Sequence, residues 1–300
     1  MKQEISSFWY TPRGYKGIGL MELLSIKSFI DNGYKFILYT YNLDDKIFKK
    51  LDELFDDFEL KDANEIVSFK NYFRDDRGSG VAAFSDYFRY NLLYLKKKKR
   101  GGVWVDLDMI CLNYIDLNKE EYIFTQEVDE DNKKSRITTS FLKFSRYSDF
   151  GKNLIQEAEK IINKRKKISW GVIGPWFLAD HVKKCGLENF VWDYKRTCQI
   201  PWCNVKIFLD NTSIDISQPF LHLFSEMWRL NNMEKNTFHQ MGVYGQLLKK
   251  HEIEKLYNQI NTCLKTSDKM LDNIASFLNI KNKTKFFIKK LKKIFKKNNA

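Results

Sequence analysis

The order of strand and helix patterns near the N-terminus constrains the fold most. Residues 5–10 (ISSFWY) are typical of a buried strand, and residues 11–19 (TPRGYKGIG) contain three glycines and a proline, which indicate a loop. In residues 20–31 the apolar positions recur at helical spacing, and residues 36–41 (FILYTY) predict a second strand. Strand, loop, helix and strand in this order form a βαβ unit, so the sequence predicts an α/β domain.

The remaining patterns extend this domain without a linker long enough to divide it. Further predicted elements are helices at 46–55, 81–99 and 150–163, a short strand-like piece within 64–73, and strands at 103–105, 122–127 and 137–144. We expect a catalytic domain over residues 1–260 and a helical C-terminal region over residues 261–300.

The composition is that of a soluble globular protein, with 43% hydrophobic and 30% charged residues. The chain contains no apolar run long enough to cross a membrane and shows no signal-peptide pattern at its N-terminus. Its five cysteines are scattered and lack CxxC spacing, which argues against a disulfide framework and favours the reducing cytoplasm.

The positive charge is concentrated at the C-terminus. Of the net charge of +13, nine lysines and no acidic residues lie in 281–300, which leaves 13 − 9 = +4 for the rest of the chain. Phe287, Leu291 and Ile294 fall on one side of a helix there, with lysine around them. This pattern predicts an amphipathic helix for an anionic membrane surface. Nucleic-acid binding and a solvated tail are the alternatives.

Two carboxylates, Asp106 and Asp108, end the predicted strand 103–105. A spacing of two places both side chains on the same side of an extended strand, and paired carboxylates form a hard-oxygen site for Mg²⁺ or Mn²⁺. Ligands bind outside the carboxyl ends of strands in open α/β sheets, which favours this interpretation. In the alternative, one acid caps a turn and the other is solvated.

Three other positions are candidates for the same site. Asp86 and Arg89 share one helix face, and their aromatic neighbours indicate a buried pair instead of a surface ion pair. His222 could supply a third ligand to Mn²⁺ or could be an ordinary core histidine. Trp9, at the end of the first strand, could stack on a nucleobase or could belong to the core.

The segments FWYT, LLSIKSFIDNGYKFILYTY, AFSDYFRYNLLY, GGVWVDLDMICL, VIGPW and HLFSEMWR follow one another over most of residues 5–230. In this order they resemble bacterial glycosyltransferases with the DXD sugar-binding motif, a group that includes capsular polysaccharide synthesis proteins and relatives of α-1,4-galactosyltransferases. The resemblance implies a GT-A type, Rossmann-like nucleotide-sugar-binding domain. Such a domain has a mixed central sheet and helical additions, here followed by a C-terminal amphipathic helix.

The resemblance also implies roles for individual residues. Asp86, Arg89 and Asp108 would be catalytic, and Asp106, Asp108 and His222 would hold Mn²⁺ or Mg²⁺. The donor would contact Trp9 through uracil stacking and Trp228 through closure over the diphosphate, together with Asp86, Arg89, Asp106 and Gly174. Where the family often has an asparagine facing the sugar, this chain offers Thr138, Thr139 or Ser140.

The function implied is that of a retaining, metal-dependent transferase. It would move a hexose or N-acetylhexosamine from a UDP-sugar, with UDP-galactose favoured, to a hydroxyl of a glycan or lipid-linked glycan acceptor. Lipo-oligosaccharide, O-antigen or capsule synthesis at the inner face of the cell membrane is the expected setting, through residues 281–300, with no nucleic-acid partner. A nucleotide-sugar hydrolase and a nucleic-acid-binding protein are the alternatives.

Overall fold

The computed structural model describes residues 2–77, 80–95, 102–129, 134–165 and 167–262. The chain divides into two compact units, Met1–Glu254 and Lys255–Ala300. In the second unit the described residues, 255–262, are helical. The predicted amphipathic segment at 281–300 lies outside the described residues. The predicted boundary between residues 260 and 261 stays a prediction.

A mixed sheet of six strands forms the centre of the first unit, in the order β3-β2-β1-β4-β7-β6. The strands β1 (Glu4–Trp9), β2 (Lys35–Thr40), β3 (Phe58–Asp62) and β4 (Gly102–Val105) run parallel. The strands β7 (Ser135–Phe144) and β6 (Ile123–Val128) complete the sheet in antiparallel pairing. The predicted α/β class with a mixed central sheet is therefore confirmed.

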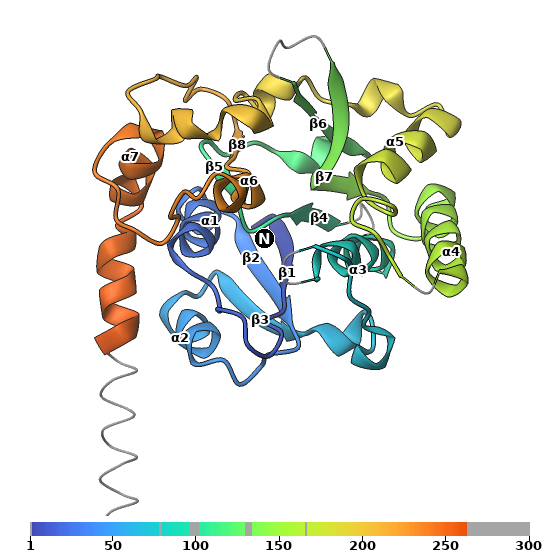
Figure 1. Cartoon of the computed structure of the whole chain (residues 1–300), viewed down its shortest axis with the longest axis horizontal. Coiled ribbons are helices and arrows are strands. Elements are labelled where there is room, and N and C mark those ends of the chain that lie inside the picture. The colour runs from blue at the N-terminus through green and yellow to red at the C-terminus, as the bar shows by residue number, and fades with distance from the viewer. Residues whose placement is uncertain (1, 78–79, 96–101, 130–133, 166, 263–300) are drawn as a thin grey trace, which may run out of the picture. The chain divides into compact units, whose positions relative to one another are not determined.

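Helices cover both faces of this sheet (Figure 1). The side chains of β2 alternate, so that Phe36 packs against Phe29 of α1 (Leu20–Asp31), while Tyr39 packs against Phe88 of α3 (Ala82–Leu95) on the opposite face. The helix α2 (Lys46–Leu54) packs beside β3, and α4 (Asp149–Lys164) packs against α3. Both faces of the parallel strands are thus buried, as an α/β sheet requires.

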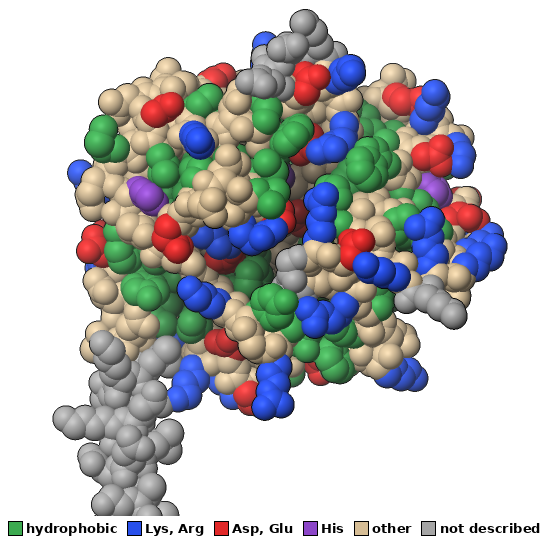
Figure 2. Space-filling view, in the orientation of Figure 1, with side chains coloured by type: hydrophobic (Ala, Val, Ile, Leu, Met, Phe, Trp, Pro, Cys, Tyr) green, Lys and Arg blue, Asp and Glu red, His purple; other side chains and the backbone are tan. Residues whose placement is uncertain are grey.

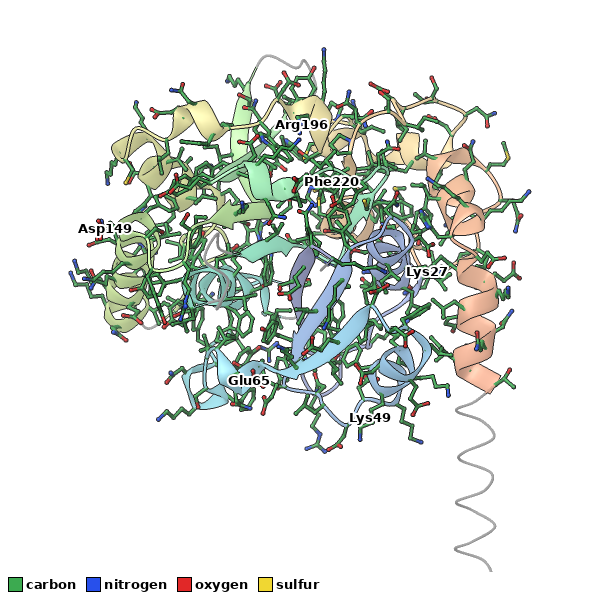
Figure 3. The ribbon with its side chains drawn as sticks, turned by 180° about the vertical axis from the view of Figure 1, so that it is seen from behind. Lys27, Lys49, Glu65, Asp149, Arg196 and Phe220 are labelled. Carbon is green, nitrogen blue, oxygen red and sulfur yellow. The ribbon has the colours of Figure 1, made fainter. Side chains whose placement is uncertain are left out.

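A second, two-stranded sheet pairs β5 (Met109–Cys111) with β8 (Phe220–His222) and joins segments that are far apart in sequence. Phe220, labelled in Figure 3, is fully buried and lies 5.7 Å from the Phe29 ring of α1 and 4.6 Å from the Phe141 ring of β7. This register sets Met109 opposite His222. The pairing brings the C-terminal half of the unit beside the residues that follow β4.

The remaining elements are short or lie near the edges of the first unit. They are η1 (Ala63–Glu65), η2 (Phe69–Asn71), η3 (Leu117–Lys119), α5 (Pro175–Lys184), η4 (Glu188–Phe190), η5 (Tyr194–Arg196), η6 (Trp202–Leu209), α6 (Ser225–Leu230) and α7 (Gly242–Lys250). The predicted strand piece within 64–73 is wrong, because the strand in this region is β3 and two single-turn helices follow it. Among the described helices, none is long and apolar enough to span a membrane.

Candidate active site

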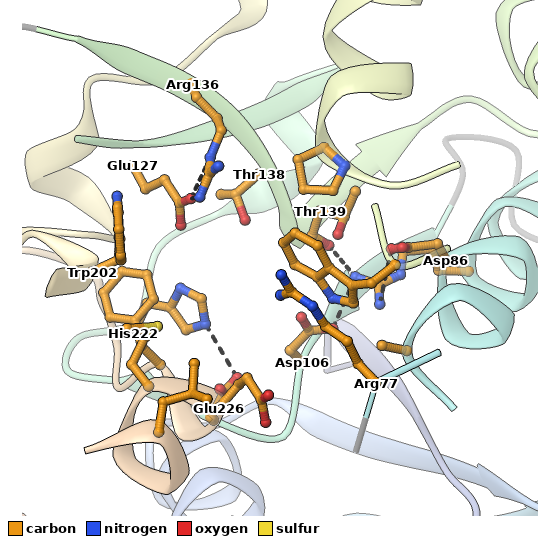
Figure 4. Close-up of a pocket in the computed structure, with 18 residues that line it drawn as sticks. Arg77, Asp86, Asp106, Glu127, Arg136, Thr138, Thr139, Trp202, His222 and Glu226 are labelled. Atoms are coloured by element: carbon orange, nitrogen blue, oxygen red, sulfur yellow. Dashed lines mark hydrogen bonds and ion pairs between the residues drawn. The ribbon is translucent and has the colours of Figure 1, made fainter. Parts of the chain in front are cut away.

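A pocket opens between the sheet and the helices α3, α5 and α6, above the end of β4 (Figure 4). Figure 2 shows a hollow near the middle of this face, with Lys and Arg side chains along its border. The pocket collects side chains from segments that are distant in sequence. Its lining includes Arg77, Asp86, Arg89, Asp106, Asp108, Glu127, Arg136, Thr138, Thr139, Trp170, Pro175, Trp202, His222, Phe224, Glu226, Met227 and Leu230.

The two acids of the DxD motif do not continue the strand. β4 ends at Val105, and the Met109 amide donates to the Asp106 carbonyl over 3.0 Å, which closes a turn before β5. The expected placement of both side chains on one side of an extended strand is therefore wrong. In the turn, Asp106 contacts Arg89 while Asp108 contacts His222. Both carboxylates still line the same pocket.

Arg89 links the helix α3 to the DxD turn. Its guanidinium is almost fully buried, with Nη1 2.9 Å from Asp106 Oδ1 and Nη2 3.3 Å from Asp86 Oδ1. The same group donates to the Thr139 carbonyl and lies 4.6 Å above the Trp104 ring. Trp104 Nε1 also donates to Asp106 Oδ1 over 2.9 Å. These contacts hold the Asp106 carboxylate in one orientation before any ligand binds.

Asp86 is a buried acid with little charge compensation beyond Arg89. Burial raises the pKa of Asp86 to about 7, although Arg89 and a hydrogen bond with Thr139 act in the opposite direction. Burial likewise raises the pKa of Asp106. A Cβ at Gly174, just before α5, would lie 2.7 Å from Asp86 Oδ2. The Gly-Pro pair therefore admits this carboxylate because residue 174 has no side chain.

Asp108 is held from the other side of the pocket. Its Oδ1 lies 3.3 Å from His222 Nε2, and its Oδ2 accepts from the backbone N–H of Ser225 over 2.8 Å. Burial would raise the pKa of Asp108, but His222 and the Ser225 amide outweigh burial and lower it to about 2. Burial likewise opposes protonation of His222, but Asp108 holds the pKa of this imidazole well above its usual value. The two side chains therefore form a buried ion pair.

Phe224 makes this contact possible through an unusual backbone. It adopts left-handed angles, φ 55° and ψ 58°, immediately before α6. A bulky residue rarely takes this conformation, which carries a strain of about 1–3 kcal/mol. The turn directs the first backbone N–H of α6 at Asp108. Strain is thus concentrated beside the DxD motif.

The donor atoms of Asp106, Asp108 and His222 suit a divalent cation, because carboxylate oxygens and a neutral imidazole are common ligands of Mn²⁺. A bound cation would displace the proton that His222 holds in its ion pair with Asp108. Two of the three side chains already touch, and all three line one pocket. Within the described ranges, however, no three His, Cys, Asp or Glu residues are gathered as a ready-made metal site. The residue types fit a metal, and its binding stays a prediction.

Three of the predicted donor contacts, Trp9, Gly174 and Trp228, lie outside this pocket lining. Trp228 is fully buried, with Nε1 donating to the Leu223 carbonyl over 2.9 Å and its ring packed 4.8 Å from Tyr244. Instead of closing over a diphosphate, Trp228 anchors α6 in the core. Trp9 is half-buried, and its Nε1 donates to Thr11 Oγ1 over 2.8 Å. Gly174 lies behind Asp86, where it bounds the carboxylate.

The pocket residues that the sequence analysis does not name include Arg77, Glu127, Arg136, Trp170 and Trp202. Glu127 and Arg136 face each other across β6 and β7, a pairing that depends on strand register. Glu127 ends one predicted strand and Arg136 directly precedes the next, and an acid and a base so placed are a usable signal for this pair. Trp170 and Trp202 lie in segments that show neither helix nor strand periodicity, so only their aromatic side chains indicate a role in ligand binding.

Residues 24–127 match a family described as "Glycosyltransferase sugar-binding region containing DXD motif". This segment contains α3 and the DxD turn, and therefore Asp86, Arg89, Asp106 and Asp108. No curated protein matches the chain.

Among solved structures, the chain is similar to the glycosyltransferase GlyE of Streptococcus pneumoniae TIGR4, at 11% identity and a TM-score of 0.47. This alignment covers 86% of the chain and 64% of GlyE, so the chain spans less than two thirds of that structure. A second similar structure is the PaToxG glycosyltransferase, at 11% identity, a TM-score of 0.42 and coverage of 63% and 73%. The match over residues 24–127 supports a glycosyltransferase with a DXD motif.

Proposed function

We propose that the chain transfers a hexose or N-acetylhexosamine from a UDP-sugar to a saccharide hydroxyl, with a divalent cation at the DxD turn. One observation carries the proposal: Asp86, Arg89, Asp106, Asp108 and His222 come from separate segments and line a single pocket. A set of buried charges is expensive to maintain for stability alone. Binding and catalysis at this pocket would explain why the chain keeps these buried charges.

The proposed chemistry depends on the charge of the leaving group. As the glycosidic bond breaks, negative charge grows on the nucleoside diphosphate, and fixed positive groups favour that state. A cation held by Asp106, Asp108 and His222 would act as a Lewis acid toward these phosphates. Arg89 adds a buried guanidinium that already has a fixed orientation. Asp86, when ionised, places negative charge where positive charge develops on the donor sugar.

Retention of anomeric configuration and a preference for UDP-galactose follow from the resemblance of the motifs. We expect front-face attack by the acceptor hydroxyl. In that case the anomeric proton signals of the product, followed by NMR, should match the donor configuration from the first turnover. A covalent sugar adduct trapped on a side chain would contradict front-face attack but leave the transferase proposal intact.

Thermal unfolding with a panel of nucleotide sugars tests the donor. We expect UDP-hexoses to raise the melting temperature only when Mn²⁺ or Mg²⁺ is present, because a ligand that binds the folded state alone stabilises it. Asp108→Asn should remove this protection. If no nucleotide sugar protects the wild-type chain with either metal, the proposed donor class is wrong.

Release of UDP distinguishes a transferase from a hydrolase. A transferase should release UDP much faster when a suitable saccharide acceptor is added, whereas a hydrolase should release it at the same rate without one. Chromatography of the products then shows whether the sugar is attached to the acceptor or free. Free sugar as the main product with every acceptor would favour the hydrolase.

The acceptor is proposed to be a glycan or lipid-linked glycan at the inner face of the cell membrane. The support is the run of nine lysines without acids in residues 281–300. Flotation with vesicles containing anionic lipid should recover the full chain but not a version that lacks 281–300. Equal flotation of the two versions would contradict membrane binding without affecting the proposed reaction.

A further inference from the structure

One wall of the pocket takes no part in the proposed donor chemistry. It is formed by Glu127, Arg136 and Trp202, which we call the acceptor wall. In Figure 4 these side chains lie on the opposite side of the pocket from Asp86 and Arg77. A ligand that occupied both sides would therefore meet the acceptor wall at one end and the Asp86–Arg89 pair at the other.

The polar part of this wall is held rigidly. Glu127 and Arg136 are direct partners in the β6–β7 ladder, and Glu127 is 6% exposed. Arg136 Nε donates to Glu127 Oε1 over 2.6 Å, and Nη2 contacts the same oxygen. Because both contacts use Oε1, the Oε2 atom can accept from a ligand hydroxyl without breaking the ion pair. The carboxylate is thus oriented in advance, which lowers the entropy cost of binding.

The apolar part consists of indole rings around the same arginine. The Arg136 Cζ atom lies 5.9 Å from the Trp176 ring centroid and 6.0 Å from that of Trp202. Trp176 is 58% exposed, and its ring meets that of Trp170 edge-on at 6.0 Å. Trp170 and Trp202 line the pocket and Trp176 lies beside Trp170, so indole rings border the polar part of the wall, as is typical of sites that bind small molecules.

Flat apolar faces beside a fixed acceptor oxygen match the chemistry of a pyranose. Such a ring presents C–H groups on one face and hydroxyls around its edge. We propose that the acceptor wall binds a pyranose ring of the saccharide acceptor, with the ring face on Trp202 and a hydroxyl on Glu127 Oε2. The inference rests on the proposed transferase function and adds the position of the second substrate.

Saturation-transfer NMR with methyl β-galactopyranoside and with methyl β-glucopyranoside tests the proposal directly. We expect at least one glycoside to give ring-proton signals with the wild-type chain and to bind about tenfold more weakly, or not detectably, to Trp202→Ala. Trp202→Phe keeps an aromatic face and should retain binding. Glu127→Gln keeps the shape but weakens the acceptor oxygen, so it should bind several-fold more weakly. Tyr114→Ala, an exposed aromatic outside the pocket lining, is the control and should bind normally.

Protection by UDP with Mn²⁺ separates this inference from the proposed function. If Trp202→Ala loses UDP protection, the residue belongs to the donor site and the acceptor wall is refuted. Absence of signals from both glycosides, or unchanged signals in Trp202→Ala, refutes it as well. If glycosides bind in a Trp202-dependent manner but no nucleotide sugar protects any variant, saccharide binding stands and the transferase proposal fails.

Discussion

Replacement of Asp86 by asparagine removes a buried charge while keeping the shape of the side chain. Asp86 is 4% exposed and lies 3.3 Å from Arg89, and burial raises its pKa from 3.8 to about 7. Between pH 3.8 and about pH 7, Asp86 therefore keeps its proton in the folded chain but has lost it in the unfolded chain. In this window the wild-type chain should lose stability as the pH rises. The asparagine of the variant does not titrate, so the variant should lose no stability through this position.

The size of the effect follows from the shift in pKa. Each pKa unit corresponds to about 1.4 kcal/mol, so a shift of about 3 units gives an upper limit on the order of 4 kcal/mol. The free energy of unfolding of Asp86→Asn, minus that of the wild type, should rise by up to this amount between about pH 4 and about pH 8. Transfer activity should fall nevertheless, because a stabilising change at an active site commonly removes function.

Urea unfolding followed by tryptophan fluorescence at a series of pH values measures this difference. Asp215→Asn is the matched control, because Asp215 is exposed and hydrogen bonds from Ser217 lower the pKa of its carboxyl. The stability contribution of Asp215 changes only below about pH 4, because its pKa lies below 3.8, so the difference curve of this control should stay flat between about pH 4 and about pH 8. A difference curve for Asp86→Asn that is flat, or that falls with pH, would refute the assignment of Asp86 as a buried acid with a raised pKa.

Three further substitutions test the geometry of the site and its support. Gly174→Ala should reduce transfer and cost about 1–3 kcal/mol in urea unfolding, because the new Cβ would lie 2.7 Å from Asp86 Oδ2; normal activity would contradict the close approach. Asp108→Asn should abolish metal-dependent transfer while circular dichroism shows an intact fold; surviving activity would mean that the motif is only a turn. Gly19→Ala should destabilise the chain because its Cβ would lie 1.8 Å from Asn236 Oδ1. When Gly19→Ala is combined with Asn236→Ala, part of the lost free energy of unfolding should be recovered in the same assay. If the losses of the two single variants simply add in the double variant, the clash is refuted.

The fold class and several elements could be predicted from the sequence because their signals are local. The helix at 20–31 was predicted with its observed bounds, since its apolar spacing and the following Asn-Gly act within a few residues. The segments at 5–10, 36–41 and 150–163 were predicted to within one residue at either end. The strand β3 was missed, because the sequence FELKD alternates only partly and is stabilised by pairing with β2.

Several side chains that the motifs indicated lie together in one pocket, and their roles there stay predictions. Asp86 and Arg89 share a face of α3, and the strand before Asp106 is buried, as the aromatic and apolar neighbours indicated. The orientation of the DxD acids was wrong because a turn at Leu107 replaces the expected strand. Trp228 was assigned to the donor by position in a motif, but its environment is the core.

Local patterns along the chain are thus enough to predict an α/β protein with buried acids beside a strand end, because periodicity and residue type act over short distances. Tertiary structure alone decided which distant groups meet those acids. The β5–β8 pairing sets His222 beside Asp108, and the β6–β7 register sets Glu127 opposite Arg136. Such contacts depend on strand register and on packing between segments that can lie more than a hundred residues apart, as Met109 and His222 do. A shift of one residue in the pairing of a strand would turn each of its side chains to the other face of the sheet.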